Sequence, residues 1–398
     1  MRPEIPRELA VHPGPIASVY LEVSRDRGGA PHQVRLRWEA LAHQLREQGA
    51  DEKTLNAAGE AATEVHPQPG AAGRAVFAAD GRVLDTADLP GPPRRELARW
   101  ALLPHLLPLL AQLPEYVPHV VVRLSRTRAA ITGIDRSGQE VLEMSDHGES
   151  HPVHKARAGG TAHYSMQHRT EEVWARNARG VAADIDRAVS EIHAELVVLT
   201  GDVRARSLVH DALGERSRAI TEQLPGPSLD DHNPDDHANA RSAEEIRRLA
   251  AQRAGERTQQ VVTQFEQERG RTEGLAVTGL AAVIRGLQRS QVATVLLRDD
   301  PSSELRAWIG PEPAQLALTE DELRGIAAPV LGQDRADAAL VRAIAGTGAE
   351  LVLLAHPARE TDPDRAGSAA GGAPLDEQPE LADGIGALLR FRDPQGEG

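Results

Sequence analysis

Residues 155–172 contain the side chains whose types and spacing best fit contact with a phosphate-rich partner. Two cations lead into the pair Gly159 and Gly160, a polar stretch follows, and an Arg/Glu-rich helix start closes the segment. Paired glycines allow backbone conformations and close approaches that other residues do not, and flanking cations attract phosphate groups. The chemistry of such a loop depends on the residue after the glycines, which here is Thr161.

The cations around this glycine pair define a candidate RNA-binding surface. Arg169, Arg176 and Arg179 recur at helical spacing and fit one stripe along a helix. Two plainer interpretations stay open: a solvated helix face, the usual place for charged side chains, and a weak surface ion pair between Arg169 and Glu172. The candidate RNA-binding or ribosome-binding residues are Lys155, Arg157, Gly159, Gly160, Thr161, His163, Gln167, Arg169, Arg176 and Arg179.

Length and composition limit the class of protein. A chain of 398 residues predicts two to three domains of roughly 150 residues each. The absence of cysteine excludes disulfides, cysteine-zinc sites and thiol nucleophiles, and it fits a reducing cytoplasm. The net charge of −14 argues against a nucleic-acid coat protein. Residues 151–180 nevertheless carry five Lys or Arg against two Glu, and only the contacting face must be positive to meet RNA.

Two groups of polar residues could suggest a metal, but their spacing does not support one. Four histidines between residues 151 and 168 lack a carboxylate partner at a metalloenzyme spacing. The acidic run at residues 230–237 lacks the glycine and the terminal glutamate of a calcium-binding loop, so we interpret it as a linker.

The chain also lacks a clear nucleotide or hydrolase motif. Gly201 and Asp202 follow an apolar run without a glycine-rich phosphate fingerprint. Thr200, Asp202 and His210 are too common a combination to indicate a catalytic triad. We therefore expect no catalytic residue, no metal and no cofactor.

Hydrophobic periodicity predicts an α/β fold made of three units. In the first unit, residues 18–23 alternate as in a strand, residues 34–45 fit an amphipathic helix, and residues 74–84 fit a hairpin with an Asp-Gly turn. The apolar run at residues 100–113 contains two prolines and is too short to span a bilayer. We expect it to form a buried, proline-interrupted helix.

The rest of the chain predicts two further α/β units. In the middle unit, paired strands at 120–124 and 129–134 precede a helix at 169–193, a buried strand at 195–200 and a helix at 203–213. The last unit opens at residues 242–245 with the sequence of a capping box for a long helix. Its other predicted elements are a helix at 280–289, a strand at 292–297, helices from 320 and at 338–345, and strands at 350–355 and 385–391.

Three motifs, taken in order, resemble the archaeo-eukaryotic class-1 release factors and their relative pelota. Residues 155–160 with residues 169–172 are similar to the peptide that carries Gly-Gly-Gln in that family. Residues 273–279 resemble its glycine-led helix start, and residues 384–390, Gly-Ile-Gly-Ala-Leu-Leu-Arg, resemble its terminal strand. More specifically, the chain resembles the bacterial release-factor-like proteins, including the actinobacterial branch related to the hibernation factor Balon. The resemblance covers roughly residues 118–392.

The resemblance implies a fold and a domain plan. The middle and C-terminal units are expected to resemble the release-factor middle and C-terminal domains. The predicted domains are an N-terminal α/β domain at 1–116, a middle domain with the Gly-Gly loop at 117–226, an acidic linker at 227–241 and a C-terminal α/β domain at 242–398.

The resemblance also implies a function on the 70S ribosome. The chain lacks the Asn-Ile-Lys-Ser tetrapeptide, so stop-codon decoding is not expected. In hydrolytic relatives glutamine follows the glycines and helps to place water at the peptidyl-tRNA ester, whereas here Thr161 lacks the carboxamide. We expect a cytoplasmic hibernation or stress factor that fills the A site and contacts rRNA, with elongation factor Tu or another translational GTPase as a possible companion and no membrane partner. The alternative is a peptidyl-tRNA hydrolase acting on stalled ribosomes.

Overall fold

The computed structural model divides the chain into two compact units. It describes residues 9, 12, 14–24, 30–64, 70–113, 115–125, 128–136, 138–147, 161–229, 236–300, 303–354 and 379–391. Unit 1 combines residues 1–113 with residues 258–398, and unit 2 comprises residues 114–257. The finer division into four segments stays a prediction. Among the described residues, no helix combines the length and apolar character needed to cross a bilayer.

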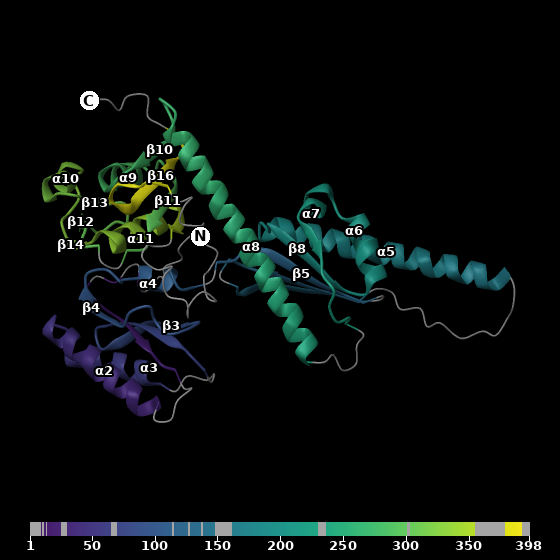
Figure 1. Cartoon of the computed structure of the whole chain (residues 1–398), viewed down its shortest axis with the longest axis horizontal. Coiled ribbons are helices and arrows are strands. Elements are labelled where there is room, and N and C mark those ends of the chain that lie inside the picture. The colour runs from purple at the N-terminus through teal and green to yellow at the C-terminus, as the bar shows by residue number, and fades with distance from the viewer. Residues whose placement is uncertain are drawn as a thin grey trace. The chain divides into compact units, whose positions relative to one another are not determined.

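The first segment of unit 1 is an antiparallel sheet with the two helices α2 and α3 on one face (Figure 1). The strand order is β3-β2-β1-β4, and β1 pairs antiparallel with both β2 and β4. Alternate residues of β1 pack on opposite faces: Val19 contacts the helices, whereas Tyr20 faces a core shared with the second segment. The elements are β1 (Ile16–Glu22), α2 (Ala30–Glu47), α3 (Glu52–Thr63), β2 (Gly73–Ala79), β3 (Arg82–Leu89), β4 (Leu97–Ala101) and α4 (Leu107–Leu110).

The second segment of unit 1 contains a mixed sheet and a smaller antiparallel sheet. The mixed sheet has the order β10-β16-β11-β15, with β11 parallel to β15 and antiparallel to β16. The smaller sheet has the order β13-β12-β14. The elements are β10 (Ala276–Thr278), α9 (Leu280–Gln288), β11 (Val292–Arg298), β12 (Arg306–Ile309), β13 (Leu316–Ala317), α10 (Glu320–Gly325), β14 (Gly332–Arg335), α11 (Ala336–Thr347), β15 (Glu350–Leu354) and β16 (Ile385–Leu389).

The two segments of unit 1 share one hydrophobic core. Tyr20, Phe77 and Leu107 from the first segment belong to the same buried cluster as Ile284 and Leu340 from the second. Tyr20 and Phe77 are thus buried in part by Ile284 and Leu340, which lie more than two hundred positions further along the chain. The core of unit 1 is complete only when both segments are present.

Unit 2 is a five-stranded sheet with helices on both faces (Figure 1). The order is β7-β6-β5-β8-β9, with β5, β8 and β9 parallel and β6 antiparallel to its neighbours. Val197 and Leu199 of β8 pack with α5, and Leu196 and Val198 pack with α8. The elements are β5 (His119–Leu124), β6 (Arg128–Ile134), β7 (Glu140–His147), α5 (Thr161–Glu191), β8 (Leu196–Gly201), α6 (Val203–Ala212), α7 (Glu215–Ala219), β9 (Thr221–Gln223) and α8 (Asp236–Arg269), whose residues from Thr258 on belong to unit 1.

Three expected elements differ from those observed. Residues 100–113 do not form one proline-interrupted helix: the run starts in β4, and its only helical part is α4. Helix α5 begins at Thr161 rather than Arg169, and α8 begins at Asp236 rather than at the expected capping box of residues 242–245. The capping box that the structure shows joins Thr319 to Glu322 at the start of α10.

The last strand explains why small residues occupy the terminal motif. Gly386 lies beneath the ring of Phe265, and a Cβ atom there would come within 2.8 Å of the ring atom Cζ. Phe265 itself is fully buried on the face of the sheet that α8 covers. A larger residue at position 386 would push Phe265, and with it α8, away from the sheet.

Candidate functional site

The expected RNA-binding residues fall in the connection between β7 and α5 and in the first turns of α5. Lys155, Arg157, Gly159 and Gly160 lie outside the described residues. The backbone of Thr161, His163, Gln167 and Arg169 is helical, because α5 starts at Thr161. The helix therefore starts at the residue that directly follows the glycine pair in the sequence.

The position of Gln167 in α5 limits what it can replace. Thr161 and Gln167 are six residues apart in one helix, which separates their backbones by about 9 Å along the axis. Gln167 therefore cannot take the place of the residue that directly follows the glycines while this helix is formed.

Arg176 and Arg179 lie on the solvent side of α5. Both are exposed. The opposite side of the helix is anchored by Ala182 and Ile185, which are buried against the strands of the sheet. Among the residues whose side chains are described, neither arginine forms an ion pair, whereas Arg187 on the same helix pairs with Asp184. The fold thus presents two cations of the expected stripe to solvent.

The turn after β8 does not provide an anion site. Gly201 has φ +99°, and a Cβ atom there would lie 2.0 Å from the carbonyl oxygen of Leu124. Asp202 then caps α6, its Oδ1 accepting hydrogen bonds of 3.0 Å from the backbone N–H groups of Arg204 and Ala205. Because the chain's own carboxylate occupies these donors, a phosphate has no place there.

His119 is a buried titratable group of unit 2. It lies in the first position of β5, and its Nδ1 is 2.8 Å from the carbonyl oxygen of Val117. Burial lowers the pKa of His119, and the hydrogen bond to Val117 opposes this shift only in part. The imidazole is therefore neutral at pH 7 and has a structural role.

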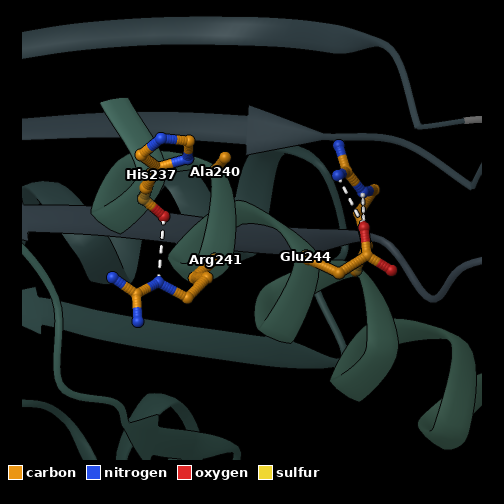
Figure 2. Close-up of a pocket in the computed structure, with 5 residues that line it drawn as sticks. His237, Ala240, Arg241 and Glu244 are labelled. Carbon is orange, nitrogen blue, oxygen red and sulfur yellow. Dashed lines mark hydrogen bonds and ion pairs between the residues drawn. The ribbon is translucent and has the colours of Figure 1, made fainter. Parts of the chain in front are cut away.

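The first turns of α8 form an open, polar surface. Figure 2 shows that His237, Ala240, Arg241 and Glu244 follow one another along this helix. Arg241 Nε donates to the carbonyl oxygen of His237 over 3.1 Å, and Arg247 donates to Glu244 over 2.7 Å. Since one helix supplies every lining residue, this is a solvated helix face and not an enclosed binding pocket.

No metal site is found among the residues that the structure describes, where no three His, Asp or Glu side chains come together. The histidines at 151 and 154 and the aspartates at 230, 231 and 235 lie outside those residues. The expectations about these two groups stay predictions.

Unit 1 contains a group of buried charges that was not predicted from the sequence. Arg99 and His105 from the first segment meet Asp334, Arg335 and Asp337 from the second. The sequence shows only that Arg99 and His105 lie in or beside an apolar run. It does not reveal that their partners lie in a distant part of the chain.

The comparisons with known proteins address the family directly. Residues 118–271 match the model of the bacterial archaeo-eukaryotic release factor family 2. The chain is 31% identical over 393 residues, 98% of its length, to the uncharacterized proteins MT2704 and Rv2629 from two strains of Mycobacterium tuberculosis, of which it covers 97%. The chain belongs to the bacterial archaeo-eukaryotic release-factor-like family.

Two solved structures align with most of this release-factor-like protein. A ribosome-bound archaeal Pelota, from a model with ABCE1, is 12% identical over 96% of this chain and 92% of that one, with a TM-score of 0.38. The Pelota of Archaeoglobus fulgidus is 16% identical over 81% and 80%, with a TM-score of 0.29.

The family assignment confirms the resemblance on which the sequence analysis depended. The matched residues run from β5 to the end of α8 and so include all of the candidate residues. Placement in the branch related to Balon stays a prediction.

Proposed function

We propose that this release-factor-like protein is a cytoplasmic hibernation or stress factor that fills the A site of idle bacterial ribosomes. In this proposal the Gly-Gly segment, residues 155–160, enters toward the peptidyl-transferase centre, and the action is steric, without bond chemistry or stop-codon decoding. The observation that carries the proposal is the identity and place of Thr161. It directly follows the glycine pair and is the first residue of α5, so no carboxamide stands where the hydrolytic relatives have one.

The charge distribution supports contact with rRNA. The whole chain carries a net charge of −14, yet α5 presents Arg176 and Arg179 to solvent. Phosphate contacts from such residues fix position and orientation without reading sequence. This suits a factor that must recognise the shape of a ribosomal site and not a codon. A translational GTPase such as elongation factor Tu is a proposed companion.

Co-sedimentation with 70S ribosomes tests the contact. We expect the parent protein to pellet with ribosomes at moderate salt, and Arg176→Ala/Arg179→Ala to bind more weakly. Each lost phosphate contact lowers the slope of log affinity against log salt by about 0.7 to 0.9. Arg187→Ala is the matched control, because Arg187 is an exposed arginine of the same helix but is paired with Asp184. A parent protein that stays in the supernatant would favour an adaptor that acts away from the ribosome.

A peptide-release assay separates the proposal from the hydrolase alternative. Ribosomes carrying peptidyl-tRNA are incubated with the parent protein, and puromycin on the same ribosomes serves as the positive control. We expect no release above the level without factor. Release that Thr161→Ala or Gln167→Ala abolishes would show that the protein is an enzyme and that the steric proposal is wrong.

A further inference from the structure

A network of buried charges joins the two segments of unit 1. The side chains of Arg99 and His105 are 16% and 7% exposed, and those of Asp334 and Asp337 are 1% and 10% exposed. Arg99 and His105 lie in the first segment, and the two aspartates lie in the second, at the end of β14 and the start of α11. Moving charges out of water costs free energy, and only well-aligned ion pairs and hydrogen bonds offset that cost.

Asp334 is the centre of one half of the network. Its Oδ1 pairs with Arg99 Nη2, and its Oδ2 accepts a hydrogen bond of 2.9 Å from the backbone N–H of Leu103. The Oδ1 atom also accepts from the backbone N–H of Arg335 over 2.6 Å. One carboxylate thus fixes both a side chain and the backbone just beyond β4.

Asp337 is the centre of the other half. Arg335 approaches it as a fork, with Nε at 3.1 and 3.0 Å from the two oxygens and Nη2 at 2.6 Å from Oδ2. His105 Nε2 lies 3.5 Å from the same Oδ2. Burial acts to raise the pKa of Asp337, but the hydrogen bonds from His105 and Arg335 outweigh it and hold that pKa below its usual value. Asp337 is therefore a carboxylate at neutral pH.

The network contributes less to stability than a fully hydrogen-bonded one would, because two of its buried nitrogen atoms have no partner. Among the described residues, Arg99 Nη1 and His105 Nδ1 are buried without a hydrogen-bond partner. The apolar core around the network includes Leu103, Leu106 and Leu340, and it supplies attraction that does not depend on direction. Directional polar contacts inside such a core can select one packing among several of similar energy.

We infer that this charge network sets the orientation in which residues 1–113 dock on residues 258–398. It makes the two segments one rigid body and contributes orientation more than net stability. The inference is independent of the proposed ribosomal function, because it concerns contacts within unit 1 alone.

The full-length chain permits a direct test because it contains no cysteine. Spin labels are attached at Gln44→Cys on α2 and Arg285→Cys on α9, two exposed positions in different segments of unit 1. Distances between the two labels are measured by double electron–electron resonance spectroscopy. The labelled parent is compared with the labelled variant Arg99→Met/Asp334→Leu, which replaces both charges by apolar groups. We expect a single narrow distance distribution in the parent. The double variant should have a broader distribution. Its urea unfolding midpoint should lie above that of Asp334→Ala, because it leaves the Leu103 N–H without an acceptor but leaves no buried cation unpaired.

Controls make each outcome decisive. Arg324→Ala removes an exposed ion pair with Glu320 in the second segment and should leave the distribution unchanged. If the double variant does not fold, Asp334→Asn keeps the volume and an oxygen acceptor for Leu103 but loses the charge, and it should broaden the distribution. An unchanged distribution in the folded variant would overturn the inference, since the apolar core alone would then set the orientation.

Discussion

The backbone N–H of Leu103 donates a hydrogen bond of 2.9 Å to Asp334 Oδ2, although 231 positions separate the two residues. Asp334 also binds the Arg99 guanidinium, so a single buried carboxylate holds two points of the first segment. Both partners lose their acceptor if this side chain is shortened. Measurements on that side chain therefore test whether the two segments of unit 1 form one cooperative structure.

We expect Asp334→Ala to lower the free energy of unfolding of unit 1 by about 3 to 5 kcal/mol, because it leaves the Arg99 cation and the Leu103 N–H buried without an acceptor. Urea unfolding followed by circular dichroism measures the change. Asp321→Ala is the control, since Asp321 is 95% exposed and its ion pair with Arg324 contributes little. Equal effects of the two substitutions would contradict the assigned role of Asp334.

Gly201→Ala should destabilise unit 2 by at least about 3 kcal/mol, because it combines a positive φ with an overlap against the Leu124 carbonyl oxygen. Loss of amide exchange protection in β5 and β8 measures the effect. At Gly325, a Cβ atom would meet nothing within 4 Å, so Gly325→Ala should change stability by less than about 1 kcal/mol. If Gly201→Ala left the stability of unit 2 unchanged, the end of β8 could not have the backbone conformation described for Gly201.

Tyr20 predicts a loss of stability at alkaline pH. Its ring is fully buried, and its hydroxyl donates to the carbonyl oxygen of His105 over 2.6 Å. Burial raises the pKa of Tyr20 above its usual value of 10.0. The unfolded chain then ionises first, so the contribution of Tyr20 is complete below pH 10 and declines as the pH rises further, by at most about 1.4 kcal/mol per pH unit. Absorbance at 295 nm should show Tyr20 ionising only with unfolding, and Tyr20→Phe should remove this part of the pH dependence.

His119 predicts a loss of stability on the acid side. Because burial lowers its pKa below the usual histidine value of 6.5, the unfolded chain takes up a proton before the native protein does. The contribution is complete above about pH 6.5 and is lost as the pH falls through the lowered native value. Thermal unfolding between pH 5 and 8 should show a shallower acid decline for His119→Gln than for the parent. An equal acid decline in the two proteins would contradict this account of His119.

Local chemistry explains the elements that the sequence predicted correctly. The hairpin of β2 and β3 turns at Asp80 and Gly81, which have φ of 51° and 73° as a mirror-image two-residue turn requires. Strand β8 was predicted from its continuous apolar run because both of its faces are covered. The family was also predictable, since its motifs keep their order along the chain.

Contacts between distant residues explain the failures. Residues 100–113 are apolar because they are buried between the two segments of unit 1, and not because they form a continuous helix. The charges of Arg99 and His105 gave no hint of Asp334 and Asp337, whose positions depend on the docking of the second segment. The start of α5 was placed eight residues late, because residues 161–168 are polar and show no apolar periodicity.

The division of unit 1 into two segments has a consequence for synthesis. Leu103 leaves the translating ribosome long before Asp334 exists, and at 5 to 20 residues per second the delay is about 10 to 50 seconds. During this interval unit 2 is completed, while Tyr20 and Phe77 still lack the residues that bury them. Nascent chains of this protein therefore carry an unfinished apolar face through most of their elongation, and this face is a natural target for a chaperone.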